Sequence, residues 1–326
     1  MKKVLFLVIL VILLVFFASC SRRDSYTVMI YTSSEDFRNE HFQRRLNEQF
    51  PNYNIIINYM TTGSLAAKLL AEGVRTDADI VGELESGFLE GLLDSLADHS
   101  GFDTSIFLDE FVPAHRRYLP FALLTGSIVI NERFLAERNI PIPTSYMDLL
   151  NPVYRGVISM PNPRSSGTGY FFLKNLVNVM GEDAAFDYFD RFAENVLQFT
   201  SSGSGPVNAL IQGEIGIALG MTMHAVNTIN SRGMPLRIMH FEEGSPFTTY
   251  GTAMIRGKET NPAVRSVFEF WATTLSREDK ELFIPGQIFR DQVNTIPNYP
   301  LDVKPADMRG IEDLETKDRL LARWRH

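Results

Sequence analysis

Short runs of serine, threonine and glycine recur along the chain, and each precedes a segment whose apolar spacing predicts a helix. The first free N–H groups of a helix and the positive end of its dipole both favour a bound anion. The same residue types are also common helix caps, so a purely structural role remains an alternative for each run. In the first run, for example, Ser34 could simply be the N-cap of the following helix. The candidate residues are Ser33, Ser34, Thr62, Gly63, Ser64, Ser165, Ser166, Gly167 and Thr168, with Ser201–Gly205 as a further run.

The run around Gly167 lies in the segment SMPNPRSSGTGYFFL, residues 159–173. A strand-like segment over 156–160 leads into it, and apolar residues at 173, 176, 177 and 180 then share one helical face. The turn from Ser165 to Gly169 is therefore predicted to hold an anion at a helix start. Arg164 either adds a positive charge to that anion or points to solvent.

Composition indicates a globular protein of 326 residues, with 45% hydrophobic residues, 21% charged residues and a formal net charge of −8. This length suits two lobes better than one core. Basic residues form no run longer than a pair, which argues against a nucleic-acid-binding surface. Six histidines and one cysteine give no zinc-ligand spacing, so no metal or other cofactor is predicted.

The first nineteen residues have the features of an export signal peptide. Lys2 and Lys3 precede a run of fourteen apolar residues, Val4–Phe17, which is short for a membrane span. Cys20 follows directly after two small residues, an arrangement that resembles a lipoprotein signal. Cleavage before Cys20, lipid on its thiol and a tether over 20–25 are expected, with an uncleaved signal anchor as the alternative. The mature chain would carry 29 basic and 39 acidic residues, a charge of −10.

Predicted strands and helices alternate along the rest of the chain, which indicates an α/β fold with mostly parallel sheets. Residues 98–120 have no regular pattern, and no internal repeat is present. Helices are predicted over 84–96, 184–197 and 262–275 and at the charged C-terminus. The predicted strands are 26–31, 54–60, 78–81, 121–131, 156–160, 214–221, 237–241 and 249–256.

Several segments between residues 26 and 320 together resemble the substrate-binding proteins of ABC transporters, in the ferric-ion, phosphonate and sugar-phosphate group. They are LAAKLLAEG followed by TDADIV, then TGSIVIN, SMPNPRSSGTGY, QGEIGIAL, FEEGSPFTTYGTAMIRG and NPAVRSVFEFWATTLS. The resemblance implies a two-lobe periplasmic-binding-protein fold of type II-like architecture, with a ligand cleft between lobes joined by crossing strands at 121–130 and 237–243. It implies one lobe from 26–122 plus 244–295, another from 123–243, and a C-terminal tail, 296–326, packed on both.

The same resemblance places Thr222, His224 and Glu243 in the ligand site. Ferric-ion binders carry a tyrosine pair shortly after the strand that matches 214–219, where this chain has Thr222 and Met223. A thioether is a poor ligand for such a hard ion. His224 and Glu243 resemble the sugar-contacting histidine and glutamate of hexose-phosphate binders, although a surface histidine and a solvated glutamate are the plain alternative.

The expected function is solute binding for an ABC importer. A small phosphate-bearing organic anion would be captured by lobe closure and delivered to a permease in the inner membrane, by a monomer held at the membrane through Cys20. A ferric-ion-binding protein is the alternative. An exported enzyme is disfavoured, because the sequence has no G-x-S-x-G segment and no convincing set of catalytic residues. A sensor or adhesin lipoprotein with this fold is not separable from a transport protein by sequence.

Overall fold

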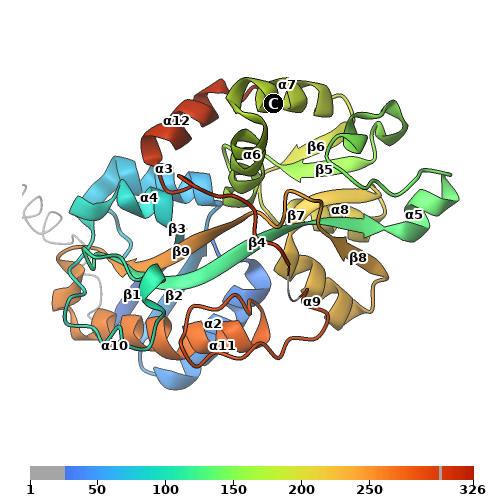
Figure 1. The fold of residues 1–326 in the computed structure, drawn as a ribbon. Helices are drawn as coiled ribbons and strands as arrows, with labels where there is room; N and C mark the ends of the chain where they lie inside the picture. Colours follow the sequence, from blue (N-terminus) through green and yellow to red (C-terminus); the bar gives the residue numbers. More distant parts are fainter. Residues whose placement is uncertain (1–25, 301–302) are drawn as a thin grey trace, which may run out of the picture.

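The computed structural model describes residues 26–300 and 303–326, which form an α/β protein around a curled nine-stranded sheet (Figure 1). The strand order is β2-β1-β3-β9-β4-β7-β5-β6, and β8 pairs with β4 beside this path. Cys20, the predicted signal peptide over 1–19 and the predicted tether over 20–25 lie outside the described residues. The strands are β1 Thr27–Thr32, β2 Asn54–Tyr59, β3 Ile80–Glu85, β4 Leu119–Asn131, β5 Ile158–Pro161, β6 Val196–Thr200, β7 Ile217–Met221, β8 Leu236–Met239 and β9 Phe247–Met254.

The sheet is mixed, so the prediction of mostly parallel strands was wrong. Strand β1 is parallel to β2 and β3, and β5 is parallel to β6 and β7. Strand β4 is antiparallel to β7, β8 and β9, and β3 is antiparallel to β9. The reason is that β4 leaves one half of the sheet while β9 returns to it, which gives these two strands opposite directions.

Strand β4 joins the two halves of the sheet. Residues 119–125 pair with β9, and residues 126–131 pair with β7 and β8. The chain returns through β8, residues 240–246 and then β9. A crossing strand was predicted over 237–243, but the strand ends at residue 239. Gly126 fixes this crossing, because its N–H donates to Pro246 O at 2.8 Å and its carbonyl accepts from Ser245 Oγ at 2.9 Å. We call the part around β1, β2, β3 and β9 the first lobe and the part around β5 to β8 the second lobe.

Helices cover both lobes, and each lobe has an aromatic core. Trp271 packs on Phe42 and Phe121 in the first lobe, whereas Phe189 packs on Tyr188, Phe192 and Trp324 in the second. The first lobe carries α2 Asp36–Gln49, α3 Thr62–Glu72, α4 Ser86–Glu90, α10 Pro262–Phe270, the π-helical turn Trp271–Leu275 and α11 Ser276–Leu282. The second carries α5 Glu132–Glu137, α6 Gly167–Met180, α7 Glu182–Phe192, α8 Gly205–Gln212 and α9 Thr222–Arg232.

Several element boundaries differ from the predictions. The predicted helix over 84–96 is helical only over α4 and a short 3-10 turn, and the predicted helix over 184–197 ends at Phe192 and gives way to β6. The sequence analysis missed α9 altogether. Strand β3 continues to Glu85 rather than ending at residue 81, since the carboxylates of Glu83 and Glu85 are paired with Arg38 and Lys317 inside the protein.

The C-terminal helix α12, Leu314–Arg323, lies across the upper edge of the molecule beside α7 (Figure 1). Leu320 and Trp324 belong to the core of the second lobe. Lys317 reaches the first lobe, where its Nζ donates to Glu85 Oε1 at 2.6 Å in a fully buried ion pair. The C-terminal segment therefore contacts both lobes.

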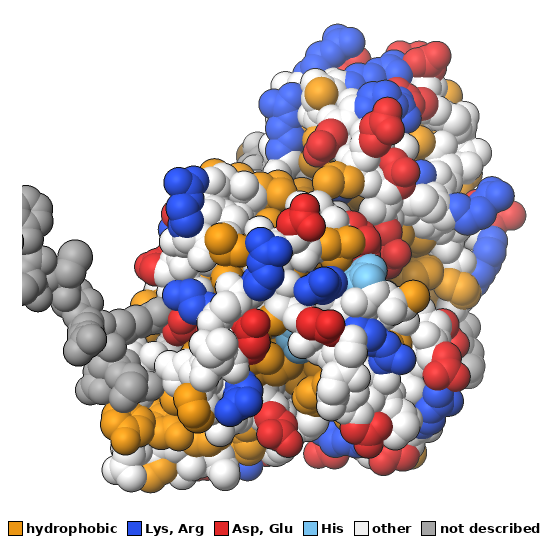
Figure 2. Space-filling view, turned by 90° about the vertical axis from the view of Figure 1, so that its left-hand side faces the viewer, with side chains coloured by type: hydrophobic (Ala, Val, Ile, Leu, Met, Phe, Trp, Pro, Cys, Tyr) orange, Lys and Arg blue, Asp and Glu red, His pale blue; other side chains and the backbone are white. Residues whose placement is uncertain are grey.

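The surface seen in Figure 2 carries lysine and arginine side chains interspersed with aspartate and glutamate. This face therefore has no broad field of one sign. Within residues 26–300 and 303–326, no helix is both long and apolar enough to cross a membrane.

Candidate ligand-binding cleft

A cavity lies between the two lobes, where the carboxyl ends of β1 and β2 face the starts of α6 and α8. Eight of its fourteen lining residues are serine or threonine. Apart from two tyrosines, Glu35 is the only lining residue with an ionisable side chain. Its volume is about 10 Å³, room for about one water molecule. The lining residues are Ser33, Glu35, Tyr59, Thr61, Thr62, Leu124, Ser165, Ser166, Thr168, Ser201, Ser202, Gly203, Met221 and Tyr250.

The first-lobe wall is built from the residues that follow β1 and β2. Ser33 lines the cavity and its Oγ donates to Glu83 O at 3.0 Å. Ser34 is buried behind the wall, where its Oγ donates to Glu83 Oε2 at 3.1 Å, so the structure does not bring this predicted ligand residue into the cavity. It is not the cap of α2 either, because Glu35 occupies the N-cap position.

The start of α3 completes the first-lobe wall. Thr62 is buried and lines the cavity, whereas Ser64 is exposed and accepts a hydrogen bond from Thr61 Oγ1 at 2.9 Å. Gly63 touches the opposite lobe, because its N–H donates to Ser165 O at 3.1 Å. A side chain at Gly63 would overlap the backbone of Arg164, so glycine is required for this close approach.

The second-lobe wall contains only neutral residues. Ser166 is the N-cap of α6 and accepts from Gly169 N at 3.5 Å, so Gly167 and Thr168 belong to the first turn of the helix and not to the predicted turn before it. Thr168 is 1% exposed, and its Oγ1 has no hydrogen-bond partner among the described residues. Gly203 packs so closely on Thr168 that a Cβ there would overlap the hydroxyl.

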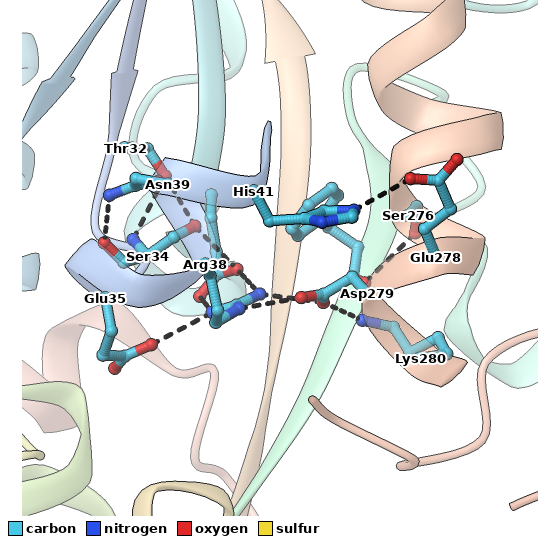
Figure 3. Close-up of polar contacts among 12 residues, drawn as sticks. Thr32, Ser34, Glu35, Arg38, Asn39, His41, Ser276, Glu278, Asp279 and Lys280 are labelled. Carbon is cyan, nitrogen blue, oxygen red and sulfur yellow. Dashed lines mark hydrogen bonds and ion pairs between the residues drawn. The ribbon is translucent and has the colours of Figure 1, made fainter. Parts of the chain in front are cut away.

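Behind the first-lobe wall lies a buried cluster of charged side chains (Figure 3). Arg38 Nε and Nη2 donate to the two oxygens of Asp279 at 2.8 and 2.9 Å, and Nη2 also donates to Glu83 Oε2 at 2.5 Å. Glu35 Oε2 accepts from Arg38 Nη1 at 3.2 Å, and Lys280 Nζ donates to Asp279 Oδ2 at 2.6 Å. Burial raises the pKa of Glu35 to about 7 despite Arg38.

The structure places His224 outside the cavity. It lies in the first turn of α9, where Nε2 is 2.8 Å from Asn208 Oδ1 and the ring stacks on Phe37 of the first lobe at 5.6 Å. Burial lowers the pKa of His224 to about 4. The histidine therefore contributes to packing between the lobes.

Glu243, Thr222 and Arg164 also lie outside the cavity lining. Glu243 lies beside Tyr146, whose pKa is raised by burial and by the charge of Glu243. Thr222 is the first residue of α9 and its hydroxyl is buried without a partner among the described residues. The guanidinium of Arg164 turns to the C-terminus of α12, with Nη2 donating to Trp324 O at 2.5 Å, so it is committed to backbone carbonyls there.

Sequence analysis missed four lining residues with distinctive side chains: Glu35, Tyr59, Met221 and Tyr250. Glu35 directly follows the Ser33-Ser34 run, and Tyr59 ends the strand before Thr61, so their positions could have been used to find them. Tyr250 could not be found in this way, because β9 reaches the cavity only through its antiparallel pairing with β4.

The described residues contain no group of three or more histidine, cysteine, aspartate or glutamate side chains placed to hold a metal ion. Tyr59 and Tyr250 line the cavity, and Tyr170 lies in the first turn of α6. Burial raises the pKa of Tyr170 and Tyr250, and the pKa of Tyr59 is raised to about 12, which disfavours the phenolate form that a hard metal ion would need.

Comparison with solved structures shows the fold. The periplasmic binding protein AfuA from Actinobacillus pleuropneumoniae, with exogenous fructose-6-phosphate bound, has a TM-score of 0.77 and 20% identity, covering 91% of this chain and 97% of that chain. Iron-bound HitA from Pseudomonas aeruginosa has a TM-score of 0.73 and 16% identity, covering 91% and 98%. The expected α/β fold of two-lobe periplasmic binding proteins is therefore confirmed.

Curated relatives match shorter parts of the chain. An uncharacterized protein of Haemophilus influenzae is 32% identical over 154 residues, which is 47% of this chain and 43% of that protein. The phosphoglycerate transport regulatory protein PgtC of Salmonella typhimurium is 24% identical over 136 residues, 39% of this chain and 33% of that protein. The chain thus spans less than half the length of the curated relatives it matches.

A family profile described as bacterial extracellular solute-binding protein matches residues 84–279. This segment is more than half of the chain, and it runs from the end of β3 to α11. The chain belongs to the bacterial extracellular solute-binding proteins.

Proposed function

We propose that this solute-binding protein captures a small phosphate-bearing organic anion in the cavity between its lobes and delivers it to the permease of an ABC importer in the inner membrane. The observation that carries the proposal is the second-lobe wall. It presents the hydroxyl of Thr168, which has no hydrogen-bond partner within the described part of the chain, next to the first N–H groups of α6. An unpaired buried hydroxyl costs free energy, and a phosphate oxygen would satisfy it.

The remaining lining supports the same ligand class. Seven further serine and threonine side chains face the cavity, and hydroxyl donors bind phosphate without needing a cationic side chain. Two comparisons are consistent with this ligand: AfuA was solved with fructose-6-phosphate bound, and PgtC is named for phosphoglycerate transport.

Capture requires the lobes to separate and close again, since the present cavity is too small for a phosphate group. We propose residues 26–122 plus 244–295 as one moving body and 123–243 as the other, with the tail, 296–326, packed on both. The crossing at Gly126 and residues 240–246 would then be the hinge. Contacts made only in the closed form would shift the population toward it.

Export and anchoring are part of the proposal. The signal peptide over 1–19 would be removed and Cys20 would carry the lipid that holds a monomeric protein at the membrane. Expression of a Cys20→Ala variant should release the protein into the soluble fraction of fractionated cells. Continued retention at the membrane would instead indicate an uncleaved anchor.

Ferric-ion binding is the weaker candidate, although iron-bound HitA has the same fold. Thr222 and Met223 occupy the start of α9, where the resemblance expects a tyrosine pair. Neither residue lines the cavity, and a thioether is a poor ligand for a hard ion.

Thermal unfolding of the protein from residue 20, without a tag, tests the proposal against a ligand panel. The panel holds fructose 6-phosphate, 3-phosphoglycerate, a phosphonate, inorganic phosphate, free fructose and ferric citrate. A ligand at a hundred times its dissociation constant stabilises by about 2.7 kcal/mol, a shift of several degrees. A shift with the phosphorylated organic compounds alone is expected. A shift with ferric citrate alone, or with none of the compounds, would overturn the proposal.

A further inference from the structure

The cavity has a feature that phosphate binding does not require, namely a carboxyl group in its wall. We propose that Glu35 makes anion capture proton-linked: it takes up one proton from solvent as the anion binds and then donates a hydrogen bond to it. This inference rests on the proposed function. Only the O–H bond at Glu35 forms, and the proton comes from water or buffer, so the step needs no other reactant.

The charge count of the buried cluster supports this assignment. Arg38 and Lys280 supply two positive charges, whereas Glu35, Glu83 and Asp279 supply three negative charges when all are ionised. An excess negative charge in a buried cluster is costly, so one of its carboxyl groups should be protonated more easily than the others.

Hydrogen-bond geometry identifies Glu35 as the carrier of the excess charge. Asp279 accepts from Arg38 through both oxygens and also from Lys280, and Glu83 accepts from two nitrogens of Arg38 and from Ser34. Glu35 has one contact with Arg38, the longest of the set at 3.2 Å. It is also the only carboxyl group of the cluster that lines the cavity.

The groups that face Glu35 do not supply the missing positive charge. The second-lobe lining contributes hydroxyl, glycine and methionine side chains alone. Partial burial of Tyr59, together with Glu35 and Asp36, raises its pKa to about 12, so it stays neutral near pH 7. The ionisable groups around Glu35 are Asp36 and Arg38 on α2, Tyr59 on β2, Glu83 on β3, Tyr250 on β9, and Asp279 and Lys280 on α11.

An arriving phosphate dianion would therefore meet a carboxylate and no cationic side chain in the lining. Protonation of Glu35 removes this repulsion and turns an acceptor into a donor. The free protein is poised for this change, because burial brings the pKa of Glu35 close to neutral. The anion should raise it further, since a nearby negative charge favours the protonated acid.

Isothermal titration with fructose 6-phosphate, in buffers of different ionisation enthalpy, tests the inference on the mature chain. Between pH 7.5 and 9 the phosphate itself is already a dianion, because its second pKa is near 6. We expect proton uptake to approach one per bound ligand towards pH 9, where the dissociation constant should rise about tenfold per pH unit. Absence of proton uptake together with a flat dissociation constant would overturn the inference.

The variant Glu35→Gln keeps the size of the side chain and supplies a permanent N–H donor. It should bind fructose 6-phosphate with no proton uptake and with the same affinity from pH 7.5 to 9. Glu48→Gln, at an exposed ion pair with Arg45, is the matched control and should keep the wild-type slope. A wild-type slope in Glu35→Gln would assign the proton to another group. If no phosphorylated compound binds at any pH, the proposed function fails as well, so the two failures are distinguishable.

Discussion

The two walls of the cavity differ in how they satisfy their polar groups. Behind the first-lobe wall, every charged side chain of the Arg38 cluster has a partner within 3.2 Å. The second-lobe wall is neutral, and the hydroxyl of Thr168 is buried with no partner among the described residues. The charged side chains of the Arg38 cluster are all paired in the absence of ligand, whereas the second wall is left with unused hydrogen-bonding capacity.

This difference indicates that the charged network makes the site rigid, whereas the hydroxyl of the second wall contributes to ligand binding. A fully paired charged network fixes the position of the strand ends and of Glu35, since breaking a buried ion pair is costly. The unpaired hydroxyl in the opposite wall gives the closed, ligand-bound form a contact that the empty form lacks. Mutations in the Arg38 cluster behind the first wall should therefore act mainly on stability, and mutations in the second wall mainly on affinity.

The largest expected effect comes from removing the centre of the charged cluster. Arg38→Met would leave the carboxylates of Glu35, Glu83 and Asp279 with Lys280 alone, and we expect a loss of about 3–5 kcal/mol in the free energy of unfolding. Urea denaturation followed by fluorescence measures it, because Trp271 lies in the core of the first lobe. Arg45→Met, in a half-exposed ion pair, should cost less than about 1 kcal/mol. Equal losses in the two variants would contradict a stabilising role for the cluster.

The second prediction concerns the contact between the walls. A Cβ at Gly167 would overlap Tyr250 Oη and lie 2.9 Å from Glu85 Oε2, so Gly167→Val should hold the lobes apart. We expect the overlap to make the free energy of lobe closure less favourable by about 3 kcal/mol. Binding of fructose 6-phosphate should then weaken about 100-fold. Small-angle scattering should show a larger radius of gyration.

Gly101→Val is the matched control for this substitution, because no described residue beyond its two chain neighbours has a heavy atom within 4 Å of a Cβ at that position. It should change neither affinity nor radius. Wild-type affinity in Gly167→Val would show that the start of α6 does not take part in closure.

Sequence analysis predicted the neutral wall better than the charged one, and the reason is the distance between partners along the chain. Hydroxyl and glycine residues at the start of α6 form a local pattern, so Ser165, Ser166 and Thr168 were predicted, and all three line the cavity. The pairing of Arg38 with Asp279 joins residues 241 positions apart. No local pattern could predict it, and the extension of β3 to Glu85 was missed for the same reason.

The resemblance to hexose-phosphate binders was less informative about individual side chains. It placed His224 and Glu243 in the ligand site, yet α9 was not predicted, and its first turn carries His224 onto Phe37. Glu243 lies by Tyr146 in the second lobe. The order of the resembling segments along the chain therefore predicted the fold. The direction in which the His224 side chain points depended on α9, which the sequence pattern did not reveal.

The third prediction tests the packing of His224 between the lobes. Its pKa in the folded protein is about 4, below the ordinary 6.5, so the unfolded chain takes up a proton first as the pH falls. This contribution to stability is present above pH 6.5 and is lost between pH 6.5 and 4. His224→Phe should keep the stack on Phe37. It should lose about 1–3 kcal/mol less free energy of unfolding than the wild type when the pH falls from 6.5 to 4.

Thermal or urea unfolding of wild type and His224→Phe from pH 8 to pH 4 measures the difference. Above pH 7 the two stability curves should run parallel, and below it the wild type should fall more steeply. Curves that stay parallel down to pH 4 would show that the imidazole is not held neutral by burial.

The smallest effect sharpens the comparison most, because it asks whether an unpaired hydroxyl serves the ligand. Thr168→Val replaces the hydroxyl by a methyl group of similar shape, so stability should stay within about 1 kcal/mol of wild type. Binding of fructose 6-phosphate should weaken about tenfold, since one hydrogen bond to the anion is lost. Thr248→Val is the matched control, because Thr248 is also 1% exposed and its Oγ1 has no partner in residues 26–300 and 303–326, but it does not line the cavity. If both variants kept wild-type affinity, the spare hydroxyl of the second wall would be a packing defect and not a ligand donor, and the contrast between the walls would no longer explain binding.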